Sequence, residues 1–252
     1  MTWGYQAYCD AVAVEAAGFA AAIKGVDPAT PVPTCPGWSL ADLIEHHGRS
    51  ERRVEYVVRN LSQGPVWSKD VPVDLPDDHA AYAEWFAAGV QPLLQTLRAA
   101  DPEAPMWTRG EDKHVSYWAR RILYEAVVHR ADAEFALGVD PVIDAWTGAD
   151  GIDEFLTNLL EFPWVVEQQR ELDRDGETVH LRATDHDAGW LITLGREGFT
   201  WRRGTGAATV AAEGAAGDLL LLVYGRLKPT DSRFKVIGNS QLLGDWLEKS
   251  AL

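Results

Sequence analysis

Cysteine is scarce in this sequence, and long apolar segments are absent. Among 252 residues there are 2 cysteines, Cys9 and Cys35, too few for a disulfide framework in a chain of this size. Cysteine use of this kind is typical of a reducing compartment, so we expect a cytoplasmic protein. The longest apolar run, residues 219–224, is too short to cross a bilayer. The N-terminal stretch lacks a basic region and carries Asp10 and Glu15, which indicates an amphipathic helix rather than a signal peptide.

Basic residues are also in short supply. The chain has 23 Lys and Arg against 38 Asp and Glu, for a formal net charge of −15. A surface this acidic repels phosphate backbones and anionic lipids, so we expect neither nucleic acid nor a membrane as a partner. The hydrophobic fraction of 46% and the charged fraction of 24% are typical of a globular protein. These features favour a soluble protein, monomer or homodimer, that acts on small molecules.

Helical patterns fill the first part of the chain. Apolar residues recur at helical spacing, and Ser39 with Asp42 three residues later resembles a capping box. Pro92 falls within a helical pattern and is expected to kink or divide it, and Pro163 is expected to end the last helix of this part. The predicted helices span residues 5–23, 39–61, 79–99, 116–137 and 145–162.

Short β-rich runs separated by turn residues follow after residue 164. The predicted strands span residues 177–184, 189–195, 198–204 and 209–213, and the predicted helices span 217–227 and 240–249. Helices first and then strands with two helices predict an α+β protein. We therefore expect two domains, a helical bundle of four or five helices over residues 1–165 and a small α+β domain over residues 166–252.

The strongest chemical signal is a polar seam on the fourth predicted helix. Glu125 and His129 lie one turn apart, with Asp132 on the same face between apolar neighbours such as Trp118 and Ile122. Burying such groups is costly unless they are paired or bind a metal. A carboxylate and an imidazole one turn apart can chelate one divalent ion. The alternatives are a simple hydrogen bond between Glu125 and His129, or a seam at the edge of the bundle.

A metal site needs a third ligand, and the second predicted helix offers two adjacent histidines, His46 and His47. Adjacent residues on a helix point in different directions, so at most one of them is expected to ligate. Periodicity places His47 nearer the middle of the apolar face and His46 towards its flank. The pattern alone slightly favours His47, although an inward histidine can also simply pack in the core.

Two segments resemble the metal-binding segments of the mycothiol-dependent maleylpyruvate isomerase family, helical-bundle proteins related to the DinB-like group. The segment PTCPGWSLADLIEHHGR has the family's ligand histidine eight residues after Trp38, at His46. The segment WARRILYEAVVHRADAE matches at Glu125, His129 and Asp132. The resemblance thus implies a DinB-like bundle whose metal ligands are His46, Glu125 and His129, against the preference from periodicity.

The resemblance also implies a chemistry. The segment GAAGDLLLLVYGRL is similar to a helix of the family's C-terminal domain that contributes an arginine to the active site, here Arg226. A divalent ion, zinc above all, would bind mycothiol as its thiolate, which attacks a small electrophilic substrate. The outcome would be isomerisation if the adduct collapses, or S-transfer if it persists. Arg226 would steady a substrate carboxylate or an oxyanion, and its alternative is an arginine that satisfies the carbonyls at a helix end.

The role of Asp132 is open between two readings. It can orient the imidazole of His129 from behind. It can equally form a salt bridge with one of the nearby arginines, Arg120, Arg121 or Arg130.

Two other functions remain open. One is a metal-dependent biosynthetic or hydrolytic enzyme that uses no thiol. The other is a non-enzymatic small-molecule-binding or regulatory protein with a structural metal. Structural zinc sites usually have four protein ligands, often including cysteine, and Cys35 would then be the fourth.

Overall fold

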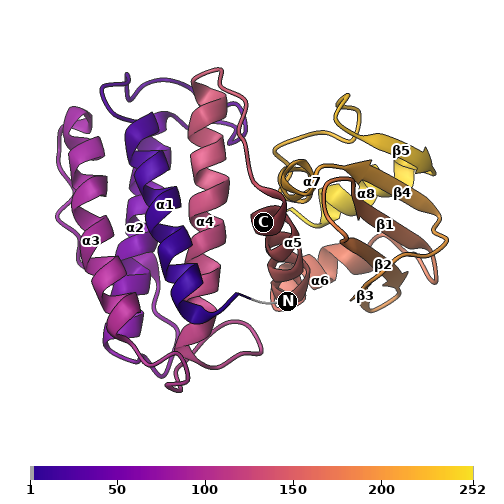
Figure 1. Cartoon of the computed structure of the whole chain (residues 1–252), viewed down its shortest axis with the longest axis horizontal. Helices are drawn as coiled ribbons and strands as arrows, with labels where there is room; N and C mark the ends of the chain where they lie inside the picture. Colours follow the sequence, from indigo (N-terminus) through magenta and orange to yellow (C-terminus); the bar gives the residue numbers. More distant parts are fainter. Residues whose placement is uncertain (1–2, 252) are drawn as a thin grey trace. The chain divides into compact units, whose positions relative to one another are not determined.

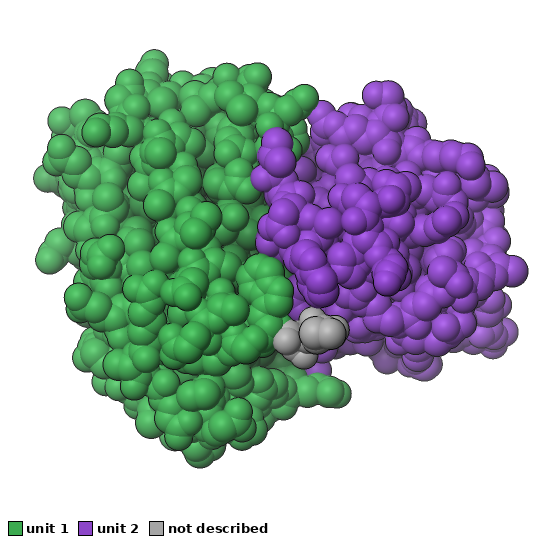
Figure 2. All heavy atoms as spheres, in the orientation of Figure 1, with its two compact units in different colours: residues 1–141 green, residues 142–252 purple. Residues whose placement is uncertain are grey.

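The computed structural model describes residues 3–251 and divides the chain into two compact units, Met1–Pro141 and Val142–Leu252 (Figure 2). We call these unit 1 and unit 2. The sequence-based boundary was residue 165, so residues 142–165 group with unit 2 and not with the helical bundle. The physical reason is the packing of the fifth helix, described below.

Unit 1 is a bundle in which α1, α2, α3 and α4 lie side by side (Figure 1). Two 3-10 turns, η1 (Ser68–Asp70) and η2 (His79–Ala81), lie between α2 and α3. Helices α1 and α2 both pack against α3 and α4. The helix bounds are α1 Tyr5–Ala22, α2 Leu40–Arg59, α3 Tyr82–Ala99 and α4 Val115–Ala136.

Local sequence signals explain where these helices begin and end. Ser39 caps α2 in a reciprocal capping box with Asp42, as predicted. Gly138 has a φ of 71° just after α4, the left-handed conformation that favours glycine at a helix end. Pro92 lies inside α3, which nevertheless continues from Tyr82 to Ala99, so the proline does not divide the helix.

Unit 2 contains a five-stranded sheet with the strand order β3-β2-β1-β4-β5. Strands β1 and β4 pair in parallel, and the other neighbouring strands pair antiparallel. Helices α6, α7 and α8 contact the sheet. The bounds are α5 Ala145–Leu159, α6 Pro163–Arg170, β1 Thr178–Ala183, β2 Gly189–Gly195, β3 Gly198–Arg203, β4 Val210–Gly214, α7 Ala216–Val223, β5 Lys235–Gly238 and α8 Ser240–Lys249.

Two glycines explain why α5 belongs to unit 2. A Cβ on Gly148 of α5 would lie 2.4 Å from the backbone carbon of Ala216, and a Cβ on Gly217 of α7 would lie 2.4 Å from the carbonyl oxygen of Ile143. Such close approach of two backbones is possible only for glycine. Helix α5 is thus fitted closely against α7.

The predicted fold class, α+β, is confirmed. One α-helix and one strand were missed. Helix α5 ends at Leu159, before the predicted end at residue 162, and Pro163 begins the missed helix, α6, where its missing N–H costs nothing. Strand β5 was not predicted because its four residues show little alternation. Within residues 3–251, no helix is both long and apolar enough to span a bilayer.

Candidate metal centre

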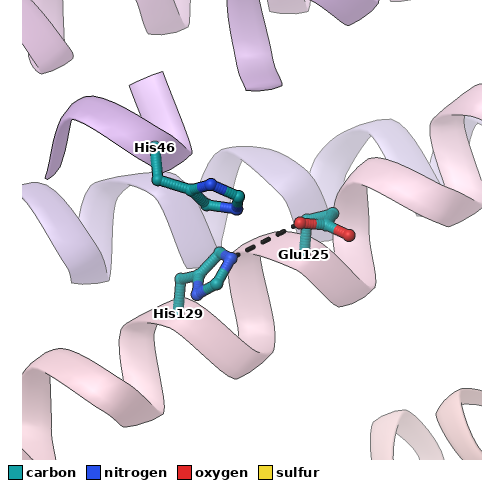
Figure 3. A group of neighbouring side chains, drawn as sticks. All are labelled: His46, Glu125 and His129. Carbon is teal, nitrogen blue, oxygen red and sulfur yellow. Dashed lines mark ion pairs between the residues drawn. The ribbon is translucent and has the colours of Figure 1, made fainter. Parts of the chain in front are cut away.

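His46 of α2 converges with Glu125 and His129 of α4 (Figure 3). One potential ligand atom from each of these residues lies within 4.8 Å of the other two. Among residues 3–251 this is the one group of three or more His, Cys, Asp or Glu side chains with such spacing. His46 is exposed, Glu125 is half-buried, and His129 is buried. The group therefore sits where α2 meets α4, with access on the side of His46.

Helix α4 is buried around most of its circumference because it packs against both α1 and α2. Charged groups on such a helix need partners. Asp132 is 0% exposed and accepts hydrogen bonds at Oδ2 from His129 Nδ1 at 3.0 Å and at Oδ1 from Thr34 Oγ1 at 2.6 Å. The thiol of Cys35 also donates to Asp132 Oδ2, at 3.5 Å.

The hydrogen bond to Asp132 settles which ring nitrogen of His129 can act as a ligand. Because Nδ1 carries the donated proton, the lone pair of the neutral ring lies on Nε2. That nitrogen lies 3.4 Å from Glu125 Oε2. The geometry is that of a metal-binding histidine oriented by a carboxylate behind it.

These side chains fit a tetrahedral ion. Zinc bonds of about 2.0–2.1 Å to nitrogen and oxygen place neighbouring ligand atoms about 3.4 Å apart, which is the separation of His129 Nε2 and Glu125 Oε2. His46 is the exposed member of the group, so its side chain has room to adjust. Two imidazoles and one carboxylate would leave a position for a small ligand.

Glu125 has a second partner in Arg121, one turn earlier on α4, which donates to Oε1 through a very short contact. Burial opposes ionisation of Glu125, but the charges of Arg121 and His129 outweigh it and hold the pKa of this carboxyl well below its usual value. Burial likewise disfavours the charged form of His129, but hydrogen bonds with Asp132 and Glu125 leave its pKa raised. A metal at Nε2 would compete with this proton, so metal affinity should fall at acidic pH.

The two adjacent histidines of α2 differ in burial, as their positions on the helix predict. His47 is 0% exposed, in agreement with the apolar periodicity, and its ring packs against Phe19, Phe86 and His129. His46 lies at the flank, and its ring centroid is 5.0 Å from that of His129. Periodicity thus predicts burial correctly, but the geometry gathers the exposed histidine and not the buried one.

A second buried pair, His47 and Glu51, adjoins this site and was not predicted from the sequence because it lies on the apolar side of α2. His47 Nε2 and Glu51 Oε1 are 3.9 Å apart, longer than a hydrogen bond, and neither side chain has a hydrogen-bond partner. Burial lowers the pKa of His47, and the charge of His129 lowers it further. Burial raises the pKa of Glu51 to about 8. Both groups are therefore neutral near pH 7.

Two further residues singled out in the sequence have defined surroundings. Arg226 belongs to unit 2 and follows α7, where its Nη1 donates to the carbonyl oxygen of Tyr224 at 2.8 Å. It thus satisfies a carbonyl at the end of α7, one of the two roles considered from the sequence. Cys35 is a half-buried thiol outside any disulfide that donates a hydrogen bond to Asp132, and it is not part of the three-residue ligand group.

Comparison with known proteins gives the family. The model of the mycothiol maleylpyruvate isomerase N-terminal domain matches residues 9–134, and that of the C-terminal domain of the same enzyme matches residues 148–245. No curated protein matches the chain. All the metal-ligand candidates lie within the first of the two matched regions.

Two solved structures share the fold. The crystal structure of a mycothiol-dependent maleylpyruvate isomerase is 13% identical, with a TM-score of 0.58, over 94% of this chain and 95% of its own. A histidine-to-alanine mutant of such an enzyme is also 13% identical, with a TM-score of 0.57, over 90% of this chain and 93% of its own. At this identity the likeness supports the fold and not the individual residues.

The family predicted from the two helical motifs is confirmed. The matched regions cover most of the chain, and they place its helical unit and its α+β unit in the same order as in the family. The chain therefore belongs to the mycothiol-dependent maleylpyruvate isomerase family.

Proposed function

We propose that this protein is a mycothiol-dependent isomerase that acts on a small electrophile with the help of a zinc ion held by His46, Glu125 and His129. The observation that carries the proposal is the convergence of these three ligand atoms within 4.8 Å, beside a buried carboxylate that orients His129. Family membership supports the thiol and the type of reaction. Maleylpyruvate, the substrate in the family's name, is the first compound to assay.

The chain's own residues have distinct tasks in this proposal. When bound, a zinc ion would supply a positive centre that lowers the pKa of a coordinated thiol. His46 and His129 offer neutral nitrogen donors, and Asp132 keeps His129 in the tautomer that has its lone pair on Nε2. Arg121 neutralises part of the charge of Glu125 and fixes its orientation.

The reaction requires no co-reactant other than the thiol. The thiolate sulfur adds to one carbon of a carbon–carbon double bond, and the π electrons move onto the conjugated carbonyl oxygen. After rotation about the resulting single bond, the electrons return, the double bond re-forms, and the thiolate leaves. Mycothiol is regenerated and nothing is oxidised. If the adduct is instead protonated and released, the net result is S-transfer, and the thiol is consumed.

Arg226 is proposed to contribute to catalysis by holding a substrate carboxylate or the developing oxyanion. Arg226 is half-buried, and its guanidinium is anchored at one nitrogen by the carbonyl of Tyr224. A guanidinium offers further N–H groups in a planar fork that matches a carboxylate. Anchoring through one of them lowers the entropy lost when the others bind.

The net charge of −15 and the two cysteines, which form no disulfide, also support a cytoplasmic protein without a nucleic-acid partner. We propose a monomer or a homodimer.

The first experiment measures zinc per chain by elemental analysis, on protein purified without a metal-affinity tag. Wild type should contain close to one zinc, and His46→Ala and His129→Ala should lose nearly all of it. His79→Ala, at an exposed histidine outside the ligand group, is the matched control and should retain zinc. Absence of zinc from wild type, even after the ion is added, would contradict the proposed centre.

The second experiment follows maleylpyruvate isomerisation with and without mycothiol. Turnover should require the thiol, and the thiol concentration should stay constant through many turnovers. Stoichiometric loss of thiol would identify an S-transferase. Turnover that is independent of the thiol would favour the alternative metal enzyme and exclude the proposed mechanism.

A further inference from the structure

Arginines gather beside the candidate metal centre in an otherwise acidic protein. Arg53 lies seven residues after His46 on α2, two turns or about 10 Å further along the helix. Arg121 lies one turn before Glu125 on α4. Together with Arg109, which precedes α4, we call these residues the arginine cluster. The charges of Arg109 and Arg121 both act on Arg53.

Arg53 is held in place by two contacts. Its Nε donates to the carbonyl oxygen of Val66 at 2.7 Å, and its guanidinium carbon lies 5.1 Å from the centre of the Trp118 ring. Trp118 is 3% exposed, and its Nε1 donates to the carbonyl of Trp107 at 3.2 Å. A guanidinium stacked on a fixed indole and anchored at Nε loses little entropy when its remaining N–H groups bind a ligand.

The positive charges of Arg109 and Arg121 act against the charge of Arg53. Burial lowers the pKa of its guanidinium, the charge of Glu125 counteracts this, and the charges of Arg109 and Arg121 lower the pKa further. Glu125 is the carboxylate whose charge favours the ionised form of Arg53, and in a loaded centre it would also serve the ion. A bound anion near Arg53 would act in the same direction as Glu125.

We infer that Arg53, flanked by Arg109 and Arg121, is a specificity-determining residue that binds a carboxylate of the electrophilic substrate beside the metal centre. Arg53 is half-buried, its guanidinium is a planar fork suited to a carboxylate, and the Trp118 ring lies beside it. The site is formed entirely by unit 1. The inference rests on the proposed function for the identity of the ligand as substrate.

The geometry gives this residue a task that differs from metal binding. A carboxylate at Arg53 would fix one end of an extended substrate about two helical turns from His46. The opposite end of the substrate would then lie near the ligand group, where the thiol is expected to attack. Fixing the reacting carbon in this way is the principal use of substrate-positioning arginines.

The test is isothermal titration of the purified protein with succinate, a dicarboxylate without an electrophilic double bond. Succinamide, of the same shape but without charge, serves as the control ligand. Arg53→Gln should weaken succinate binding about tenfold or more, because a hydrogen bond to a charged group is lost. Arg53→Lys should recover part of the affinity, since it keeps the charge but not the planar fork.

Arg59→Gln is the matched control on the same helix, at an exposed arginine that pairs with Glu55. It should bind succinate as wild type does, and zinc content should be unchanged in all three variants. Equal succinate affinity in Arg53→Gln, Arg53→Lys and wild type would overturn the inference, as would a wild type that binds succinamide as tightly as succinate. Failure of the thiol-dependent assay with intact Arg53-dependent binding would instead contradict only the proposed function.

Discussion

Two groups of buried polar side chains lie next to each other in unit 1, and they are satisfied to very different degrees. On α4, His129 and Asp132 are 7% and 0% exposed, and both have hydrogen-bond partners. On α2, His47 and Glu51 are both 0% exposed, and neither has one. The rings of His47 and His129 are only 5.4 Å apart, so the contrast arises within one small region of the core.

The contrast separates two ways of keeping polar groups inside a helical bundle. Asp132 accepts hydrogen bonds from three side-chain donors, and one of these bonds orients His129. His47 and Glu51 lack such partners and avoid charge by shifting their pKa values in opposite directions. The first arrangement serves a metal ligand directly, whereas the second reduces the stability of the fold.

The largest effect is expected when Glu51 is replaced by glutamine, which cannot ionise. In the unfolded chain Glu51 loses its proton near its ordinary pKa of 4.5, whereas the folded protein keeps the proton up to a pKa of about 8. Between these values the folded state binds more protons, so the free energy of unfolding falls as pH rises. Glu51→Gln should therefore stabilise unit 1 increasingly from pH 4.5 to 8, with an upper limit of about 5 kcal/mol at the alkaline end.

Thermal unfolding of wild type and Glu51→Gln at pH 5 and pH 8 measures this effect. Glu55→Gln is the matched control, because Glu55 lies one turn further along α2 and already pairs with Arg59. It should give no pH-dependent gain. A Glu51→Gln variant that is less stable than wild type at pH 8 would show that the carboxyl has a partner in solution, and the two groups of side chains would then be alike.

A smaller effect is expected at Asp132. In Asp132→Asn the amide group has only one acceptor oxygen, so it cannot accept from Thr34, Cys35 and His129 together. Zinc affinity should fall about 10- to 100-fold, as is typical when the group that orients a metal-binding histidine is changed. Competition with a zinc-binding dye measures the affinity. Asp10→Asn, at an exposed carboxylate paired with Arg98, should leave it unchanged.

Unchanged zinc affinity in Asp132→Asn would mean that the carboxylate only packs in the core. Like His47 and Glu51, Asp132 would then have no role in metal binding, in spite of its hydrogen bonds.

Much of this architecture could be predicted from the sequence because it depends on local patterns. The cap of α2 at Ser39 and the end of α4 at Gly138 follow from residue types within one helical turn. The i and i+4 spacing of Glu125 and His129 likewise predicts that they share a face. Strand β5 and the grouping of α5 with α7 depend on contacts between distant segments, and local periodicity does not predict such contacts.

The choice between His46 and His47 shows the same limit of local periodicity at the metal centre. Periodicity identifies the more buried histidine, but a ligand must reach a point that α4 determines, and the sequence of α2 contains no information about that point. The motif supplied by the family resolved the choice in favour of His46, which is the histidine that the structure brings to Glu125 and His129. Glu51 follows His47 by four residues, the spacing of Glu125 and His129, but it was missed because the apolar periodicity of α2 gives no sign that a carboxyl is buried among its apolar residues.

The smallest effect, and the finest test of the contrast, is expected at Thr34. Its hydroxyl donates to Asp132 Oδ1 at 2.6 Å from the segment that links α1 and α2. Thr34→Val keeps the shape of the side chain but removes the donor, and a single hydrogen bond contributes about 0.5–1.5 kcal/mol, so zinc affinity should fall about two- to tenfold. Thr34→Ser retains the hydroxyl and should bind zinc as wild type does. If the serine variant is weak and the valine variant binds zinc as wild type does, the methyl group and not the hydrogen bond matters, and Asp132 would hold His129 without help from this segment. If only the valine variant is weak, the hydrogen bond of Thr34 helps Asp132 to orient His129, so the segment before α2 contributes to the metal site. His47 and Glu51 have no comparable hydrogen-bond partners.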